Sequence, residues 1–347
     1  MGRTSVIALL TIGTLAGLPA PLLASDGCVE ISAANVATTG NIAAPGCYVL
    51  TSDLLQGLAV AAPDVSIDLN GFTITPPSGS AITLNGPIDH LEIRNGTVHA
   101  IDTAAIQAPV SPGFPVDRIH VYRDLRIVSD AAAGVAYGMN DSLLLGVQFE
   151  NVVIDAAGNG VEVIGTGGNC AVKHLRVHRC EIHSSEMAAI ALIGAGGSSF
   201  TVNGFRAESS TLISESGLAA VFIDTTQIPN GGTAGEIHGA IHGCNLAAPS
   251  TSTGAVVYFA AALGTLHCTD NDLAATGASG PGTEYAFWAP AGGFITVIDN
   301  TSSAAVTPGG GGAPLATSGL VYSPALGYDT AMSTYLYSNF DVFAGQY

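Results

Sequence analysis

Charged residues are scarce in this sequence, and basic residues are the scarcest. Of 347 residues only 10% are charged, and 9 Lys and Arg stand against 27 Asp and Glu, which gives a formal net charge of −18. A nucleic-acid-binding surface needs clustered basic side chains, whereas the sequence has a single lysine, Lys173. A coiled coil or helical bundle is also excluded, because it needs Lys, Glu, Leu and Arg in quantity. Hydrophobic residues make up 48% of the chain, which is enough to build a core and argues against acidic disorder.

The first 24 residues have the layout of a secretory signal peptide. Arg3 supplies a positive charge, an apolar run extends from Val6 to Leu18, and small residues lead to a cleavage position near Ala24. A membrane anchor is the alternative, but the run is shorter than the ~20 residues that a span needs. We therefore expect a secreted, cell-surface or periplasmic protein without a transmembrane span. Loss of Arg3 would leave 8 basic residues and a charge of −19.

All six cysteines lie beyond this segment. An even number of cysteines in an exported chain favours disulfide bonds. Pairing by proximity in the sequence predicts three bridges, Cys28 with Cys47, Cys170 with Cys180 and Cys244 with Cys268. Two buried free thiols are the alternative for each pair. No Cys-x-x-Cys motif or cluster of metal ligands occurs in the sequence, so no metal site is predicted.

A short β-rich segment recurs along most of the chain. Each copy ends in a polar or small residue, at positions 70, 95, 124, 151, 180, 210, 244, 271 and 300, with a mean spacing close to 29 residues. A second short β-rich segment follows in the same phase, for example at Ala81–Leu84 and Gly160–Val163. Units of this length without a helical period predict an all-β parallel β-helix of about nine or more rungs. A single rung is too small to bury its apolar face, so stacked neighbours supply the core.

The segment Val65–Ile74 resembles the opening rung of bacterial right-handed parallel β-helix proteins of the pectin-lyase-like superfamily. The repeat covers about residues 45–305. This resemblance implies a right-handed parallel β-helix but no single activity, because the superfamily includes lyases, hydrolases, epimerases, esterases, tailspikes and adhesins. The expected organisation is a signal peptide at 1–24, an N-terminal cap at 25–60, the β-helix at 61–306, and a Gly-rich linker with an aromatic tail at 307–347 that packs on the rod.

Period-two alternation predicts which side chains of the first strand of each rung face outward. The inward set is Ile67, Ile93, Val121, Val147 and Val177. Their polar neighbours would form an outer stripe, and many enzymes of the superfamily keep their active sites on such a stripe. A uronic-acid polymer held there would have its carboxylates neutralised by arginine and a ring proton removed by histidine or lysine.

The candidate site residues follow from this stripe. The catalytic candidates are Lys173, Glu150, Arg176 and His178, and the substrate-binding candidates are Glu92, Arg94, His120, Tyr122, Gln148 and Arg179. The alternative is structural: Arg94, Arg123, Glu150 and Arg179 would compensate one another across stacked strands. Known catalytic signatures of polygalacturonases and pectate lyases are absent from the sequence, and the negative charge opposes binding of polyuronates.

Two function classes therefore remain open. The first is a secreted protein that binds or acts on a polysaccharide along the first sheet, as a lyase or hydrolase. The second is a non-enzymatic surface or structural β-helix, such as an adhesin or assembly component. No cofactor is firmly indicated, although Asp270–Asp272 is compatible with a Ca²⁺ site. The recurring Asn70, Asn95, Asn151, Asn271 and Asn300 are better explained as a ladder of turn residues.

The second strand of each rung has a different outer face. Its outward residues are expected to be Thr83, Gln107, Ala136, Glu162, Ala191, Phe222, Val257 and Trp288. This face becomes apolar toward the C-terminus, and a sheet that is apolar on both sides is normally covered. The aromatic tail, a partner subunit in an oligomer, or a stacked sugar could cover it, and the tail is favoured because it lies at the same end of the rod.

Overall fold

The structure is a computed structural model of the whole chain. It describes residues 27–86, 88–112, 119–195, 199–217, 219–225, 236–249, 255–260, 263–276, 285–288, 294–298, 300–302 and 321–322. The expected signal peptide at 1–24 lies outside the described residues, as does the expected linker and tail at 307–347 apart from Val321–Tyr322. No helix in the described part of the chain is both long and apolar enough to cross a membrane.

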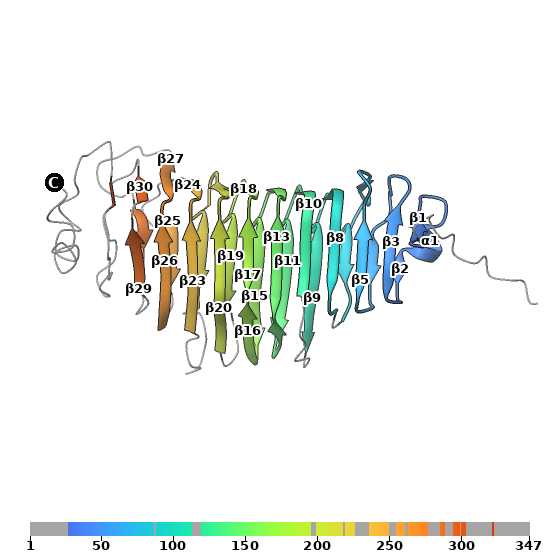
Figure 1. Cartoon of the computed structure of the whole chain (residues 1–347), viewed down its shortest axis with the longest axis horizontal. Coiled ribbons are helices and arrows are strands. Elements are labelled where there is room, and N and C mark those ends of the chain that lie inside the picture. Colours follow the sequence, from blue (N-terminus) through green and yellow to red (C-terminus); the bar gives the residue numbers. More distant parts are fainter. Residues whose placement is uncertain are drawn as a thin grey trace, which may run out of the picture.

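Parallel strands wind into an elongated solenoid, which confirms the predicted all-β parallel β-helix class (Figure 1). The larger of its two sheets has 21 strands. They are β1 (Val29–Ile31), β3 (Gly46–Leu50), β5 (Val65–Asp68), β6 (Thr73–Ile74), β8 (Leu91–Ala100), β10 (Ile119–Ser129), β12 (Leu143–Leu144), β13 (Gly146–Glu150), β14 (Val153–Ala156), β16 (Asn169–Lys173), β17 (Leu175–His178), β18 (Glu181–Ser184), β20 (Ser199–Glu208), β21 (Thr211–Ser214), β23 (Glu236–His242), β24 (Asn245–Pro249), β26 (Leu263–Thr269), β27 (Asp272–Thr276), β29 (Phe294–Ile298), β30 (Asn300–Ser302) and β31 (Val321–Tyr322).

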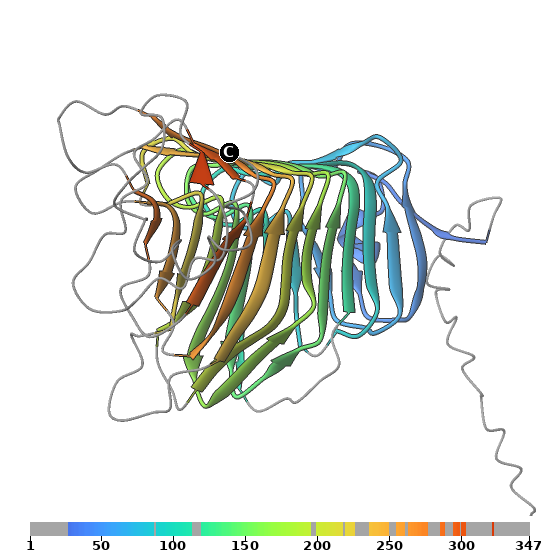
Figure 2. The same ribbon diagram turned by 60° about the vertical axis from the view of Figure 1, so that its left-hand side comes forward.

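The smaller sheet has ten strands, which follow one another in sequence order. They are β2 (Asn41–Ile42), β4 (Leu58–Val60), β7 (Ile82–Leu84), β9 (Ile106–Pro112), β11 (Val135–Asn140), β15 (Val161–Gly167), β19 (Ile190–Gly194), β22 (Val221–Asp224), β25 (Ala255–Ala260) and β28 (Tyr285–Trp288). The two sheets form the walls of the solenoid (Figure 2). The short helix α1 (Val36–Thr39) lies near the N-terminal end, where β1 to β4 already pair with later strands of both sheets.

The core runs along the axis as columns of stacked apolar side chains. Strand registers align Ile67 with Ile93, and Phe149 with Val177, in neighbouring rungs, and all four side chains are fully buried. Alternate residues along each strand point outward, as the pleat requires. The predicted inward positions Ile67, Ile93, Val147 and Val177 are therefore confirmed.

The predicted face is wrong at one rung. Val121 faces outward, whereas His120 and Tyr122 are 1% and 0% exposed and align with the buried Leu91 and Ile93. Both polar side chains meet Tyr137 of β11 inside the solenoid. The Tyr137 hydroxyl lies 2.9 Å from Nδ1 of His120 and 2.6 Å from the hydroxyl of Tyr122. This hydrogen bonding offsets the cost of burying polar groups, so His120 and Tyr122 leave the outer stripe.

A similar one-residue shift occurs in the smaller sheet. The predicted outward column is aligned from Thr83 to Phe222 as expected, but it continues through Tyr258 rather than Val257. Val257 is fully buried. The rings of Phe222 and Tyr258 stack with centroids 4.6 Å apart.

The larger sheet bends at a column of left-handed residues. Positive φ values between 49° and 64° recur once per rung, at Asn70, Asn95, Asp124, Asn151, Arg179, Ser209 and Asp270, and Gly243 occupies the same place at 60°. Asn, Asp and Gly tolerate this conformation best. Of the five recurring asparagines predicted to form a turn ladder, Asn70, Asn95 and Asn151 occupy this column. Asn271 and Asn300 lie one residue later, buried, with Asn271 Nδ2 donating to Asn300 Oδ1 over 2.8 Å.

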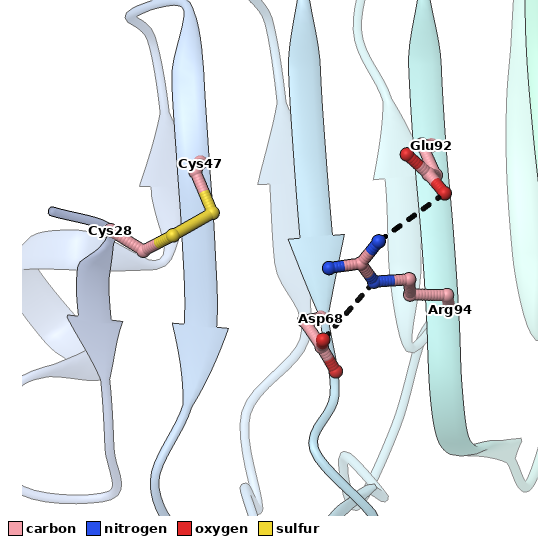
Figure 3. The surroundings of a disulfide bond; sticks show 5 residues. All are labelled: Cys28, Cys47, Asp68, Glu92 and Arg94. Atoms are coloured by element: carbon pink, nitrogen blue, oxygen red, sulfur yellow. Dashed lines mark hydrogen bonds and ion pairs between the residues drawn. A yellow bond between two sulfur atoms is a disulfide. The ribbon is translucent and has the colours of Figure 1, made fainter. Parts of the chain in front are cut away.

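Only one of the three predicted disulfides is present. Cys28 and Cys47 are bridged and tie β1 to the start of β3 (Figure 3). Cys170, Cys180, Cys244 and Cys268 are buried free thiols. Proximity in the sequence is a poor guide here, because Cys170 lies in β16 whereas Cys180 follows β17, beyond the turn at His174. Burial raises the pKa of the Cys180 and Cys244 thiols to about 11.

Candidate functional site

The outer face of the larger sheet carries most of the predicted site residues. Two outward columns run across β5, β8, β10, β13, β17, β20 and β23. The first column is Ser66, Glu92, Val121, Gln148, Arg176, Arg206 and Ala240, and the second is Asp68, Arg94, Arg123, Glu150, His178, Glu208 and His242. Charges of both signs are therefore interspersed along the rod, although Arg94 adjoins Arg123 and Arg176 adjoins Arg206.

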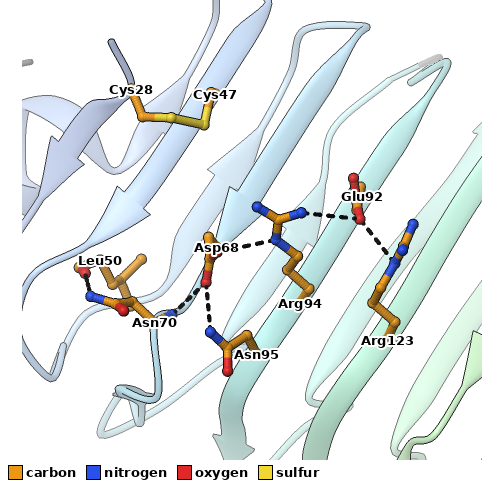
Figure 4. A network of polar contacts seen from close by, with 9 residues as sticks. All are labelled: Cys28, Cys47, Leu50, Asp68, Asn70, Glu92, Arg94, Asn95 and Arg123. Carbon is orange, nitrogen blue, oxygen red and sulfur yellow. Dashed lines mark hydrogen bonds and ion pairs between the residues drawn. A yellow bond between two sulfur atoms is a disulfide. The ribbon is translucent and has the colours of Figure 1, made fainter. Parts of the chain in front are cut away.

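Charges at the N-terminal part of this face are paired with one another (Figure 4). Arg94 Nε lies 3.1 Å from Asp68 Oδ2, and its Nη1 lies 3.7 Å from Glu92 Oε1. Arg123 Nε lies 2.9 Å from the same Glu92 oxygen. Glu92 and Arg94, two expected substrate-binding residues, thus already neutralise each other and their neighbours.

The four catalytic candidates do not converge. His178 Nδ1 lies 4.0 Å from Glu150 Oε1, so these two side chains are neighbours. Arg176 instead binds Glu208, with Nη2 2.7 Å from Oε2. Lys173 ends β16 and aligns with Asn203, so the left-handed turn at His174 separates it from β17. A shared reaction centre for all four residues is not formed.

A polar pocket opens on this face. It has a volume of about 390 Å³ and is lined by Arg123, Asp124, Glu150, Asn151 and Arg179. Asn151 Nδ2 donates to Asp124 Oδ1 over 2.6 Å, which fixes the turn side of the pocket. Arg123, although paired with Glu92, lines the pocket together with Arg179. The pocket therefore combines two guanidinium groups with amide and carboxylate oxygens.

Arg179 is unusual among the residues of the left-handed column. Every other member of that column is Asn, Asp, Ser or Gly, whereas Arg179 brings a long cationic side chain to φ 53°. A left-handed conformation costs an ordinary residue about 1–2 kcal/mol. No carboxylate within the described part of the chain forms an ion pair with Arg179. An exposed, unpaired cation held at an unfavourable backbone position points to a role other than stability.

Sequence reasoning found three members of this pocket and placed them in different roles. The sequence predicts a catalytic role for Glu150, a substrate-binding role for Arg179 and a structural role for Arg123. It does not predict that Asp124 and Asn151 line the same pocket. The spacing of 27 or 28 residues between positions 124, 151 and 179 is the signal that could have grouped them. Gln148 lies on the same face, between Val121 and Arg176 of the neighbouring strands.

The calcium hypothesis gains no support from the geometry. The Asn271 side chain is engaged with the Ile241 carbonyl and with Asn300, and the Asp270 carboxylate lies 3.4 Å from His242 Nδ1. Across the described ranges, no group of three or more His, Cys, Asp or Glu side chains could hold a metal ion.

Comparisons with known proteins return no relative for this chain. No protein-family model, no curated protein sequence and no solved structure matches it. The architecture is therefore defined as a parallel β-solenoid by its own strand pairing, and its site has to be judged from geometry and chemistry.

Proposed function

We propose that this protein is a secreted β-solenoid that binds an acidic polysaccharide along the outer face of its larger sheet. The polar pocket at Arg123 and Arg179 would receive a carboxylate group of the polymer. Membership of the pectin-lyase-like superfamily, implied by the Val65–Ile74 segment, is part of this proposal. The observation that carries it is Arg179, a cation without an ion-pair partner among the described residues, at a left-handed position within a polar pocket.

The negative charge of the protein does not prevent such binding. Charges separated by more than the Debye length, about 8 Å at physiological ionic strength, are largely screened. A carboxylate in the pocket would therefore respond mainly to Arg123, Arg179 and the lining carboxylates. A bidentate guanidinium–carboxylate contact contributes about 1.5–3 kcal/mol, and tenfold in affinity corresponds to about 1.4 kcal/mol. Loss of Arg179 should thus weaken binding about tenfold or more.

Binding is better supported than cleavage. A general base must come within about 2.6–3.2 Å of the proton it removes, and its partners must be positioned around the same atom. Among the four catalytic candidates, Glu150 and His178 are the pair whose charged groups come within 4.0 Å of each other, whereas Arg176, two residues from His178 on β17, pairs with Glu208. Lyase or hydrolase activity would therefore depend on Glu150 and His178 alone. A purely structural or adhesin-like rod, with no saccharide ligand, is the competing class.

The experiment is a binding titration of the mature chain with matched uronate and neutral oligosaccharides. Arg179→Asn is the informative variant, because asparagine is the commonest residue of the left-handed column and should keep or improve the fold. Arg206→Asn is the control, since Arg206 is exposed on the same face and lies outside the pocket. We expect uronate-selective binding that Arg179→Asn weakens about tenfold and Arg206→Asn barely changes.

Product analysis on the same samples separates binding from catalysis. New reducing ends would indicate hydrolysis, and ultraviolet absorbance from unsaturated products would indicate a lyase. Either activity, if abolished by Glu150→Gln, would favour the enzymatic version. Absence of both with intact binding supports a non-catalytic polysaccharide-binding protein. Failure to bind any saccharide would favour the structural class.

A further inference from the structure

The smaller sheet carries a second, chemically different cavity. It has a volume of about 190 Å³ and lies where the turns before β19 and β22 meet the outer face of these strands. Met187, Ala188, Ile193 and Phe222 supply its apolar lining, and Asn159, Glu186, Ser216 and Gly217 complete it. This cleft is separate from the polar pocket on the larger sheet, with which it shares no lining residue.

Size and chemistry restrict what the cleft can take. An apolar cavity of about 150 Å³ holds one benzene molecule, so a cleft of about 190 Å³ fits a single aromatic ring. Asn159 is only 2% exposed, and its amide is already engaged with the Ala188 N–H and with Glu162. Met187 is 49% exposed at the rim. A ring seated in the cleft would therefore also cover the thioether of Met187.

The C-terminal segment of the chain is rich in aromatic residues. The 25 residues that follow Tyr322 contain six Tyr and Phe residues, no Lys or Arg, and two Asp. Ser216 and Gly217 of the cleft follow β21, and β21 is connected through β24, β27 and β30 to β31 by four successive strand pairings. Four strand spacings amount to about 19 Å, whereas 25 extended residues reach up to about 80 Å.

We propose that an aromatic side chain of residues 323–347 docks into the cleft beside Phe222 and covers Met187. The segment carries little charge, so its docking rests on apolar contact with Phe222, Met187 and Ile193. The neighbouring Tyr258 ring, stacked on Phe222, extends the surface that the segment would cover. The docked side chain thereby covers the part of the smaller sheet's outer face at Met187, Ile193 and Phe222.

Oxidation of Met187 by dilute hydrogen peroxide, followed by peptide mass spectrometry, tests this docking in the full chain. Methionine sulfoxide forms readily only on accessible thioethers. The comparison variant replaces all six aromatic residues after Tyr322 by serine and keeps the chain length. We expect Met187 to oxidise about tenfold more slowly in the unmodified chain, which corresponds to about 1.4 kcal/mol of docking free energy.

Met139, only 3% exposed, serves as the internal control for an intact solenoid and should stay unoxidised in both proteins. Phe222→Ser should remove the protection of Met187, whereas Ile101→Ser, at an exposed position outside the cleft, should leave it unchanged. Equal Met187 oxidation in the unmodified and serine-substituted chains would overturn the proposal. Protection that disappears on dilution would also overturn it, because the ring would then come from a second copy of the chain.

Discussion

Tyr137→Phe should destabilise the solenoid more than any comparable loss of a single hydroxyl group. The Tyr137 hydroxyl joins the two sheets across the core, because it contacts His120 and Tyr122 of β10 from its place in β11. Nε2 of His120 lies 2.9 Å from the Ile88 carbonyl, so the Nε2–H donates there and Nδ1 accepts from Tyr137. Removing the hydroxyl therefore breaks two contacts and leaves buried polar atoms on both neighbours.

The expected loss follows from these two contacts. A buried polar group that loses its partner costs about 1–3 kcal/mol, so Tyr137→Phe should lower the free energy of unfolding by about 2–4 kcal/mol. Tyr48→Phe is the matched control: its hydroxyl donates one bond, over 2.8 Å, to the Ala44 carbonyl, and its removal should cost about 1 kcal/mol.

Urea unfolding followed by both circular dichroism and fluorescence provides the measurement. Coincident transitions of the two signals are needed before a free energy is assigned to a solenoid. If Tyr137→Phe costs no more than Tyr48→Phe, the buried network contributes little, and burial of His120 and Tyr122 would need another explanation.

Two further predictions concern the core. Gly160→Ala should lower the free energy of unfolding by about 1–3 kcal/mol, because the new Cβ would lie 2.2 Å from Ile182 Cγ2 and 2.5 Å from the Ala189 carbonyl oxygen. Gly146→Ala is the control and should be tolerated, since its new Cβ would have no atom closer than 3.8 Å. Thermal unfolding of the two variants checks this prediction. Because burial raises the Cys180 and Cys244 pKa from 9.0 to about 11, the folded state holds these protons longer than the unfolded state, and stability should fall as the pH rises from about 9 to 11. A Cys180→Ser, Cys244→Ser variant should show a shallower alkaline fall in urea titrations, and an unchanged fall would contradict the assignment.

The repeat made the fold predictable, but its spacing leaves the register of each strand open by one residue. At Ile67 and Ile93 the apolar residue is also the inward one, so alternation assigns the face correctly. At Val121 the same reasoning fails, because His120 and Tyr122 are buried through the hydroxyl group of Tyr137, which lies on the opposite sheet in the next strand, β11. Shifting a strand by one residue exchanges its two faces, and only tertiary contacts settle which face is buried.

The sequence predicts which face of the solenoid carries the polar site residues, but it does not predict which of these residues line one pocket. Glu150 and Arg179 were identified from their placement beside the stacked strands. Their grouping with Asp124 and Asn151 depends on the left-handed turn of each rung, which brings residues 27 or 28 positions apart into one column. The unbridged cysteines show the same limit, since closeness in sequence does not bring two side chains to one side of a turn.

The pocket at Arg179 is tested most directly by isothermal titration of the mature chain and its Arg179→Asn variant with a uronate oligosaccharide. Saccharide binding through this pocket predicts an affinity about tenfold weaker for Arg179→Asn, together with a free energy of unfolding that is unchanged or up to about 1 kcal/mol higher. Equal affinities for the two proteins, or weaker binding accompanied by lost stability, would contradict the role assigned to Arg179.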